Sequence, residues 1–430
     1  MDTAATPGAP LETTPRSGGY RIYVLAMLIL VYTFNFIDRQ IVGILAVPIK
    51  GELHLSDTEL GSIGGFAFAA FYTFLGIPVA RLADRYSRMR IMTIAFALWS
   101  LMSAACGLAR SFGQLFLCRL GVGVGEAGGV APAYSLICDY FPPRQRARAL
   151  GAYAFGIPIG GAIATLAGGY LAARVGWRAA FYVVGLAGLL IVPLFYLTVR
   201  EPARGGLDAP ATRSGPATFG AVLALLWRKP SFWALALGAS TASMAGYALL
   251  FWMPAFLVRS FNVDLTHAAR AMGGLLLVGG ITGTWMGGVL ADRLGVRRKA
   301  AFALVPAIAF MAIVPFYVVG VMSPTLAICV AVFLVPTALS LVWLGPITSA
   351  IQHLVPPAMR TTTSALFLFI NNLIGIGAGT TLTGVLSDAL KARFAGEALR
   401  YAILANTGLY LIAAALLVWG ARRLERDWER

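Results

Sequence analysis

Charged residues are scarce in this chain. Asp, Glu, Lys and Arg make up 12% of its 430 residues, whereas a soluble domain carries about 25%. Hydrophobic residues make up 59%, and the mean hydropathy is +0.78. So few polar groups cannot cover a surface that faces water all round. The composition therefore excludes a soluble globular protein and indicates a chain solvated by lipid.

Cysteine and histidine are also rare, and none of them has metal-site spacing. The cysteines lie in apolar stretches and are expected to be buried thiols without disulfides: Cys106, Cys118, Cys138 and Cys329. The histidines sit near segment ends, which favours solvent or the membrane interface: His54, His267 and His353. The chain has no G-x-x-x-x-G-K-[ST] loop and no clustered nucleophile and base. We therefore expect no cofactor, no metal, no ATP drive and no enzyme activity.

The net charge of +16 could suggest a nucleic-acid partner. The basic residues, however, form short runs between long apolar stretches, without aromatic residues interleaved on a polar face. This pattern excludes nucleic-acid binding.

A bilayer core of about 30 Å needs roughly 20 apolar residues per helix, and the sequence predicts twelve such helices. The first six are 20–49, 57–81, 91–109, 112–138, 146–173 and 177–199. The second six are 231–259, 268–291, 300–320, 324–354, 361–388 and 401–421. The first is too long for a signal-peptide core. The predicted parts are a disordered cytoplasmic tail (1–19), an N-terminal six-helix bundle (20–199), a cytoplasmic linker (200–230), a C-terminal six-helix bundle (231–421) and a cytoplasmic tail (422–430).

Loop charge predicts the orientation, because cytoplasmic loops carry an excess of Lys and Arg. The loops after even-numbered helices hold Arg85, Arg88, Arg90, Arg144, Arg146, Arg148, Arg293, Arg297, Arg298 and Lys299. The loops after odd-numbered helices are poorer in positive charge. Both termini should therefore be cytoplasmic. Abundant Ala, Gly and Arg indicate a bacterial source, hence an inner (plasma) membrane.

The loop after the second helix of each half carries a repeated motif. Residues 81–90 read RLADRYSRMR and residues 289–298 read VLADRLGVRR. Two ordinary basic loops would share arginines, but they would not share the Asp at the same position. The match indicates duplicated six-helix halves, which favour neither a receptor nor a channel.

The second copy resembles the G-x-x-x-D-R-x-G-R-R loop of the Major Facilitator Superfamily; the first copy departs from it at Ala80 and Ser87. Residues 119–126 (RLGVGVGE) resemble the family's fourth-helix motif, and residues 156–161 (GIPIGG) its fifth-helix motif. The resemblance covers about residues 20–421. It implies an all-α membrane protein with twelve transmembrane helices in two pseudo-symmetric six-helix bundles, working by alternating access around a midplane cavity.

In that family the loop motif gates conformational exchange at the cytoplasmic face. The resemblance implies interhelix contacts that stabilise an outward-open state. The gating residues would be Asp84, Arg85, Arg90, Asp292, Arg293 and Arg298.

Shorter stretches look like the Spinster subgroup, whose members are linked to export of lysophospholipids and sphingolipids. These are NFIDRQ at 35–40, LSD at 55–57, GEA at 125–127, GWR at 176–178 and REPARG at 200–205.

Four charged residues fall within predicted membrane helices: Asp38, Arg39, Arg119 and Glu126. Such residues are costly and usually mark ion or substrate paths. At 1.5 Å per residue, Arg119, Asp38 and Glu126 lie about 10, 17 and 21 Å from the outer ends of their helices. Asp38 and Glu126 are candidate proton acceptors, and an arriving proton could release Arg119 to hold an anionic headgroup. Arg39 is a candidate second anion contact, although about 100° of helix rotation separates it from Asp38 and it could bind elsewhere. The alternative is a purely structural ion-pair network.

The second half offers neutral side chains instead. Candidate substrate contacts are Asn35 and Tyr153 from the first half, and Tyr247, Phe251, Trp252, Trp343, Asn371 and Asn372 from the second. Ordinary packing or an interface belt is the alternative for the aromatic residues. At least one of the adjacent asparagines should turn inward to find a partner. Charge in one half and apolar surface in the other suit an amphiphile with an anionic head.

Gly123, Gly125 and Gly128 match the dinucleotide pattern G-x-G-x-x-G. No strand precedes them, so we expect close helix packing rather than phosphate binding. Prolines within the segments should kink or end helices.

These features predict a proton-coupled or proton-gated secondary transporter for an amphipathic organic anion such as a lysophospholipid or a sphingolipid-like molecule. Alternatives are transport of a hydrophilic sugar acid or a drug-like compound, or a proton-independent facilitator. The expected partners are the substrate, protons and membrane lipids, and we expect a monomer.

Overall fold

The computed structural model describes residues 18–203, 219–295, 298–356 and 359–428. Some side chains within helices are not described, among them those of Asp84, Asp292 and Arg293. Across these ranges the chain is helical and contains no strand. The predicted tail up to residue 17 and the linker residues 204–218 lie outside the described residues. Gly18 and Gly19, which the prediction places in the tail, instead begin the first helix.

The first group of helices runs through ten elements. They are α1 (Gly18–Ile44), α2 (Ala46–Leu53), α3 (Asp57–Gly64), α4 (Phe66–Arg85), α5 (Arg88–Cys106), α6 (Phe112–Glu126), α7 (Val130–Tyr140), α8 (Pro143–Ala154), α9 (Gly156–Val175) and α10 (Trp177–Thr198). A short helix, α11 (Phe219–Trp227), lies within the predicted linker.

The second group follows with longer helices and one π-helical turn. They are α12 (Pro230–Phe261), α13 (Leu265–Gly295), α14 (Ala301–Val321), α15 (Leu326–Leu339), α16 (Leu344–Gln352), α17 (Arg360–Asn372), η2 (Leu373–Ala378), α18 (Gly379–Phe394), η3 (Ala395–Glu397), α19 (Ala398–Ala405) and α20 (Thr407–Asp427). Each predicted segment coincides with one long helix or with a short series of helices broken by a turn. The architecture is two six-segment helical bundles, as predicted.

Nine helical stretches among the described residues are long and apolar enough to cross a bilayer. One of them, Thr362–Asp427, contains both of the last two predicted segments. The fourth and eighth predicted segments are not among the nine. The fourth comprises α6 and α7, which the turn at 127–129 separates. The eighth corresponds to α13, which has 31 residues.

Prolines explain where several segments break. Pro48, Pro132, Pro158 and Pro346 each occupy the third position of the helix that follows a break. N–H groups in the first turn of a helix have no intrahelical partner, so proline costs little there. The prediction that prolines kink or end helices holds at these four positions.

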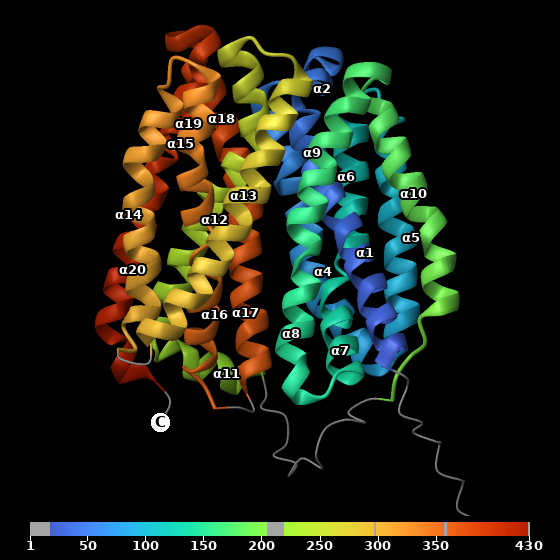
Figure 1. Ribbon diagram of the computed structural model, residues 1–430, viewed down its shortest axis with the longest axis vertical. Coiled ribbons are helices and arrows are strands. Elements are labelled where there is room, and N and C mark those ends of the chain that lie inside the picture. The colour runs from blue at the N-terminus through green and yellow to red at the C-terminus, as the bar shows by residue number, and fades with distance from the viewer. Residues whose placement is uncertain (1–17, 204–218, 296–297, 357–358, 429–430) are drawn as a thin grey trace, which may run out of the picture.

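The two bundles stand side by side, with α1 beginning and α20 ending at the lower edge of Figure 1. We call this edge the terminal side and the opposite edge the far side. The bundles meet where α3 packs on α18, α9 on α13 and α1 on α12. Close backbone approaches between bundles gather toward the far side. For example, a Cβ at Gly61 would lie 2.5 Å from the Thr380 carbonyl oxygen.

Candidate functional site

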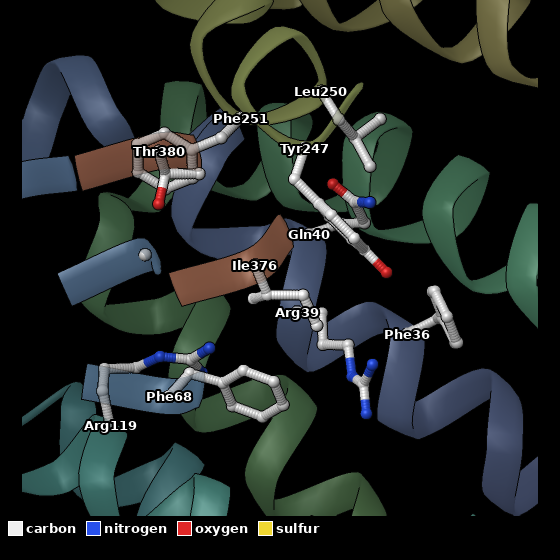
Figure 2. Close-up of a pocket in the computed structure, with 11 residues that line it drawn as sticks. Phe36, Arg39, Gln40, Phe68, Arg119, Tyr247, Leu250, Phe251, Ile376 and Thr380 are labelled. Carbon is white, nitrogen blue, oxygen red and sulfur yellow. The ribbon is translucent and has the colours of Figure 1, made fainter. Parts of the chain in front are cut away.

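A small cavity lies between the bundles, with about 30 Å³ available to the centres of water molecules. The first bundle supplies Phe36, Arg39, Gln40, Gly64, Phe68 and Arg119 to its lining. The second bundle supplies Tyr247, Leu250, Phe251, Ile376 and Thr380. Both cationic groups therefore come from one side and a mostly apolar surface from the other (Figure 2). This asymmetry agrees with the charge distribution along the sequence.

The side chains of Arg39 and Glu126 form an ion pair between α1 and α6. Nε of Arg39 donates to Oε2 of Glu126 at 2.8 Å, and the exposed fractions of the two side chains are 12% and 0%. Asn35 lies buried one turn before Arg39, beside Glu126. The sequence left the position of Arg39 open; the structure pairs it with Glu126.

Asp38 and Arg119 meet through the backbone rather than through their charges. Nη1 of Arg119 donates to the backbone carbonyl of Asp38 at 3.2 Å. The Asp38 carboxylate instead accepts a hydrogen bond from the Ser103 hydroxyl on α5. Asp38 and Glu126 are both fully buried and lie within electrostatic range of each other. Asp38, Arg39, Arg119 and Glu126 thus form one group, which we call the charge cluster.

The glycines of α6 place this helix against its neighbours. A Cβ at Gly123 would lie 2.5 Å from the Phe68 carbonyl oxygen, and one at Gly125 would lie 2.6 Å from the Trp99 nitrogen. Only glycine allows such approach, so the G-x-G-x-x-G stretch serves helix packing, as predicted. Glu126 is the last residue of α6. A helix C-terminus repels negative charge, and the ion pair with Arg39 offsets that repulsion.

Aromatic rings surround the two arginines. The Arg39 guanidinium lies 4.8 Å from the ring centroid of Phe68 and 4.6 Å from that of Tyr72. The Arg119 guanidinium lies 5.7 Å from the same Phe68 ring. Figure 2 shows Phe68 between the two cationic groups. The ring keeps two like charges apart while presenting its electron-rich faces to them.

Several polar atoms of the charge cluster remain unused. Arg39 Nη2, Arg119 Nε and Glu126 Oε1 are buried, and none of them has a hydrogen-bond partner within the described part of the chain. A buried donor or acceptor without a partner costs about 1–3 kcal/mol, and more when it is charged. The site is therefore suited to a ligand, or to water, that supplies the missing partners.

The cavity is too small for a large ligand. Small-molecule pockets usually measure about 300–1,000 Å³, roughly ten to thirty times the space found here. Space for a substrate must come from side-chain or helix movement around the cavity.

Some predicted substrate contacts lie elsewhere in the structure. Trp252 is fully buried, and its Nε1 donates to the Thr380 carbonyl at 2.9 Å. Trp343 packs on Phe367, outside the residues that line the cavity. Tyr153 is buried in α8 and stacks on Tyr32 with ring centroids 4.3 Å apart.

The adjacent asparagines behave as the sequence predicted. Oδ1 of Asn371 accepts from the Ser243 hydroxyl at 2.9 Å, and Asn371 is buried. Asn372 is half-buried and ends α17 where the π-helical turn begins. Of the predicted contacts from the second half, Tyr247 and Phe251 line the cavity.

The structure describes the side chains of three of the six predicted gating residues. The side chains of Asp84, Asp292 and Arg293 lie outside the described set, while those of Arg85, Arg90 and Arg298 are exposed. Their gating role stays a prediction.

Sequence reasoning missed several neutral residues of the site. Ser103, Phe68, Ile376 and Thr380 carry no sequence signal that separates them from ordinary residues of an apolar helix. Gln40 belongs to the NFIDRQ stretch and could have been included for that reason.

Residues 28–380 match the family model described as Major Facilitator Superfamily. The chain is 34% identical to an "MFS-type efflux pump" of Mycolicibacterium smegmatis, over 98% of each chain. It is 29% identical to "Protein spinster homolog 1" of Xenopus tropicalis, over 96% of this chain and 83% of that protein. A crystal structure of a bacterial homologue of the human lysosomal transporter Spinster, in an inward-facing and unoccupied conformation, superposes with a TM-score of 0.89. That structure is 32% identical to this chain, over 96% of this chain and 99% of that one.

Proposed function

The chain belongs to the Major Facilitator Superfamily and is a transporter, and from this premise we propose that it couples proton movement to transport of an amphipathic organic anion. The substrate would be a lysophospholipid or a sphingolipid-like molecule, moved by alternating access. The similarity to Spinster homologues supports this substrate class.

One observation carries the proposal. Arg39 and Arg119 both line the cavity, and each keeps a buried N–H group without a partner among the described residues. A phosphate or other anionic headgroup would supply acceptors for both, with the short charge-assisted bonds that arginine forms best. Both arginines are thus assigned to headgroup binding.

The ion pair between Arg39 and Glu126 gives the coupling its physical basis. An anionic headgroup that binds Arg39 competes with Glu126 for the same donor. The displaced carboxylate would be left charged in a buried site, which is unfavourable unless it takes up a proton. Substrate binding and protonation of Glu126 therefore favour each other. Asp38 lies close enough to share in the same exchange.

The apolar part of the substrate has a matching surface. Leu250, Phe251 and Ile376 line the cavity opposite the arginines. Tyr247 also lines it and offers both an apolar ring and a polar hydroxyl. An acyl chain would gain about 0.8 kcal/mol per buried CH₂ against such a surface. A compact hydrophilic anion would gain nothing there.

Orientation, domain bounds and gating are part of the same proposal. The two bundles would comprise residues 20–199 and 231–421, with both termini and the 200–230 linker in the cytoplasm of a bacterium. The far side would then face outward, and its close packing would make this an inward-facing state. Asp84, Arg85, Arg90, Asp292, Arg293 and Arg298 would stabilise the opposite, outward-open state. The transporter would work as a monomer.

Transport in proteoliposomes tests the proposal. A labelled lysophospholipid would be followed with and without an imposed pH gradient, using wild type, Asp38→Asn and Glu126→Gln. We expect gradient-driven transport in wild type and its loss in both variants. Arg270→Gln, an exposed arginine on α13, is the matched control and should transport normally. Transport that ignores the gradient and survives both substitutions would identify a facilitator instead.

A drug-like compound is the second candidate substrate, and the M. smegmatis relative is named an efflux pump. Transport of a lipophilic drug, without transport of a lysophospholipid, in the proteoliposomes would support this second candidate. Transport of a sugar acid alone would overturn both.

A further inference from the structure

The second bundle carries a groove on its outer surface, which we call the outer groove. It lies between α14 and α20, which pack on each other at one edge of the molecule (Figure 1). About 340 Å³ of it is available to the centres of water molecules, against about 30 Å³ in the cavity between the bundles. The residues that line it include Met311 of α14 and Leu411, Ala415, Val418, Trp419 and Arg422 of α20. The outer groove is therefore large enough to hold a ligand without any helix movement.

Small side chains on α20 create this hollow. Ala414 and Ala415 lie between the larger Leu411 and Trp419 along the same helix, and Met311 of α14 contributes to the lining as well. Met311, Leu411 and Trp419 are exposed by 46%, 50% and 41%, so no other helix of the described chain covers the groove. In a bilayer such a surface contacts lipid. An acyl chain fills the hollow, because a void would forfeit dispersion contacts.

The outer groove extends over about one leaflet. Arg422 lies near the end of α20, at the terminal side, and Leu411 lies about 16 Å from it along the helix axis. On α14, Met311 lies about 15 Å from the helix start at the same side. Half of a hydrocarbon core of about 30 Å is about 15 Å. One lipid tail therefore matches the groove when its headgroup is at the terminal side.

Cationic groups gather at the terminal end of the groove. Arg422 lines it, is exposed and has no ion-pair partner in the described part of the chain. The Arg423 guanidinium lies 4.2 Å from the ring centroid of Trp419, which is part of the lining. Lys299, just before α14, lies 5.2 Å from the ring centroid of Trp428, just after α20. Tryptophan and basic residues at such a position are typical of the membrane interface.

Two carboxylates at the same helix end do not cancel this charge. Asp427 is buried, and its Oδ2 accepts from the Ser231 nitrogen at 3.1 Å. Glu425 is exposed and forms no ion pair with another described residue. Arg426 adds a further exposed cation. The mouth of the groove is therefore positively charged, and its charge complements an anion.

We propose that the outer groove binds an anionic phospholipid of the leaflet at the terminal side. The phosphate would accept hydrogen bonds from Arg422 and Arg423, because the planar guanidinium group matches phosphate geometry. One acyl chain would lie along Ala415 and Leu411, against Met311. The site is separate from the charge cluster, and it does not depend on what the protein transports.

Headgroup charge would give this site its selectivity. Lipid tails are as apolar as the groove, so a tail gains no hydrophobic energy when it moves there from the surrounding bilayer. Any lipid can supply the tail. An anionic lipid brings a net negative charge to the arginines, whereas the amine of a zwitterionic lipid opposes them. We therefore expect anionic lipids to bind more tightly than zwitterionic lipids with the same tails.

A second copy of the chain fits this groove less well than a lipid. Two copies in one membrane share one orientation, so a two-fold contact through α20 would place the same residues of both copies at the same depth. Arg422 and Arg423 of one copy would then face their equivalents in the other. Repulsion between these like charges opposes such a dimer.

Native mass spectrometry of the purified protein in detergent tests the site. The probes are phosphatidylglycerol, which is anionic, and phosphatidylcholine, which is zwitterionic, with identical acyl chains. The test variants are Arg422→Gln, which removes a headgroup contact, and Ala415→Leu, which fills the groove. Residue 415 is exposed and leucine is a good helix former, so this variant should fold. The control is Arg200→Gln, an exposed arginine at the terminal side of the first bundle.

Wild type should retain one phosphatidylglycerol more tightly than any phosphatidylcholine. Arg422→Gln should raise the Kd for phosphatidylglycerol roughly tenfold or more, because hydrogen bonds between charged groups are the strong ones. Ala415→Leu should weaken binding of both lipids, since it removes the space for the tail. Arg200→Gln should bind both lipids as wild type does.

Three results would overturn the proposal. One is an equal Kd for phosphatidylglycerol in wild type and Arg422→Gln. Another is equal binding of the two lipids to wild type, which would show only unselective lipid around the helices. The third is a dimer that persists without lipid and is disrupted by Ala415→Leu, which would assign the groove to a second copy.

The Arg119→Gln variant separates this site from the proposed transport site. Arg119 lines the cavity between the bundles and is distant in sequence from α14 and α20, so phosphatidylglycerol binding should survive its substitution. Lipid binding that is lost in Arg119→Gln but kept in Arg422→Gln would place the lipid in the cavity and overturn the outer groove. Failure of wild type to transport a lysophospholipid, with selective binding intact, would count against the proposed substrate alone.

Discussion

Arg39 and Glu126 are 87 residues apart in the chain and are joined by a 2.8 Å ion pair inside the first bundle. Each is the only side-chain ion-pair partner of the other among the described residues. Their pairing leaves Nη2 of Arg39 and Oε1 of Glu126 without a hydrogen-bond partner among the described residues. In the proposed mechanism, an anion that binds Arg39 would compete with Glu126 at this contact.

Removing one partner of this pair should destabilise the protein. Arg39→Met or Glu126→Leu alone leaves an uncompensated buried charge, which costs about 3–5 kcal/mol. The double variant Arg39→Met/Glu126→Leu should recover most of that loss, because neither charge of the pair remains. Thermal unfolding in detergent measures the stabilities. A double variant as unstable as the sum of the singles would contradict this account. Transport should be lost in all three.

Gly123 should tolerate no side chain. A methyl group there would lie 2.5 Å from the Phe68 carbonyl oxygen, so α4 and α6 would have to separate. Overpacking of this kind costs about 1–3 kcal/mol. We expect Gly123→Ala to lower both the melting temperature and transport. Gly246→Ala on α12, which would meet no atom within 4 Å, is the control and should leave both unchanged.

The aromatic residues predicted as substrate contacts should fall into two classes. Trp252→Phe removes the hydrogen bond to Thr380 and should lower stability by about 0.5–1.5 kcal/mol, with KM unchanged. Tyr247→Ala alters the cavity lining and should raise KM. Concentration-dependent transport together with thermal unfolding separates the two. A raised KM in Trp252→Phe would instead indicate that Trp252 contacts the substrate.

Low pH should weaken the hydrogen bonds of Glu201, which hold the segment that follows α10. Burial alone would raise the pKa of Glu201, but hydrogen bonds from the Met89 nitrogen, Arg88 and Ser87 lower it below its ordinary value. The carboxylate therefore stabilises the fold above its unfolded pKa of about 4.3, and this contribution is lost as pH falls through the lower folded value. Melting temperatures between about pH 6 and 3 should fall more steeply in wild type than in Glu201→Gln. Parallel curves would contradict this role.

The helices could be predicted from the sequence, because apolar run length acts locally. Their interruptions could be predicted only in part, since some breaks follow proline but Pro78 and Pro254 lie inside continuous helices. The charge cluster could also be predicted in outline, since Asp38, Arg39, Arg119 and Glu126 are rare intramembrane charges. Their partners could not. Whether Arg39 faces Glu126 depends on the rotation of α1 and on where α6 ends, and neither follows from local sequence.

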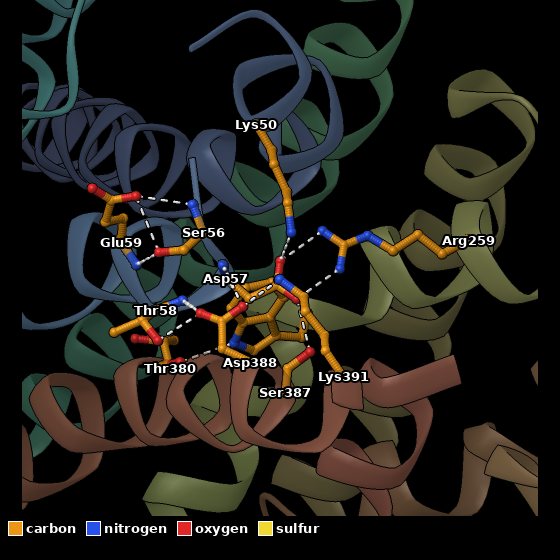
Figure 3. Close-up of polar contacts among 11 residues, drawn as sticks. Lys50, Ser56, Asp57, Thr58, Glu59, Arg259, Thr380, Ser387, Asp388 and Lys391 are labelled. Atoms are coloured by element: carbon orange, nitrogen blue, oxygen red, sulfur yellow. Dashed lines mark hydrogen bonds and ion pairs between the residues drawn. The ribbon is translucent and has the colours of Figure 1, made fainter. Parts of the chain in front are cut away.

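The contacts at the far side, which Figure 3 shows, could not be predicted from the sequence. Asp57 and Asp388 look like ordinary polar residues at helix ends. Their hydrogen bonds join positions 331 residues apart, and no pattern of spacing predicts that pairing. Trp252 was predicted as a substrate contact because it is a large aromatic residue in a neutral half; its Nε1 donates to a backbone carbonyl, and its substrate role stays a prediction.

The π-helical turn η2, at Leu373–Ala378, bears on how this chain is aligned with its relatives. A π-turn takes up one more residue than an α-helix of equal rise, so side chains before and after it are out of phase by about 100°. The turn therefore sets the angle between the face that carries Asn371 and the face that carries Ser387. A relative without this turn needs a one-residue gap within 373–378, and an ungapped alignment would match the wrong residue to Asp388. Deleting one residue there would likewise rotate α18 relative to α3 without changing any residue of either helix.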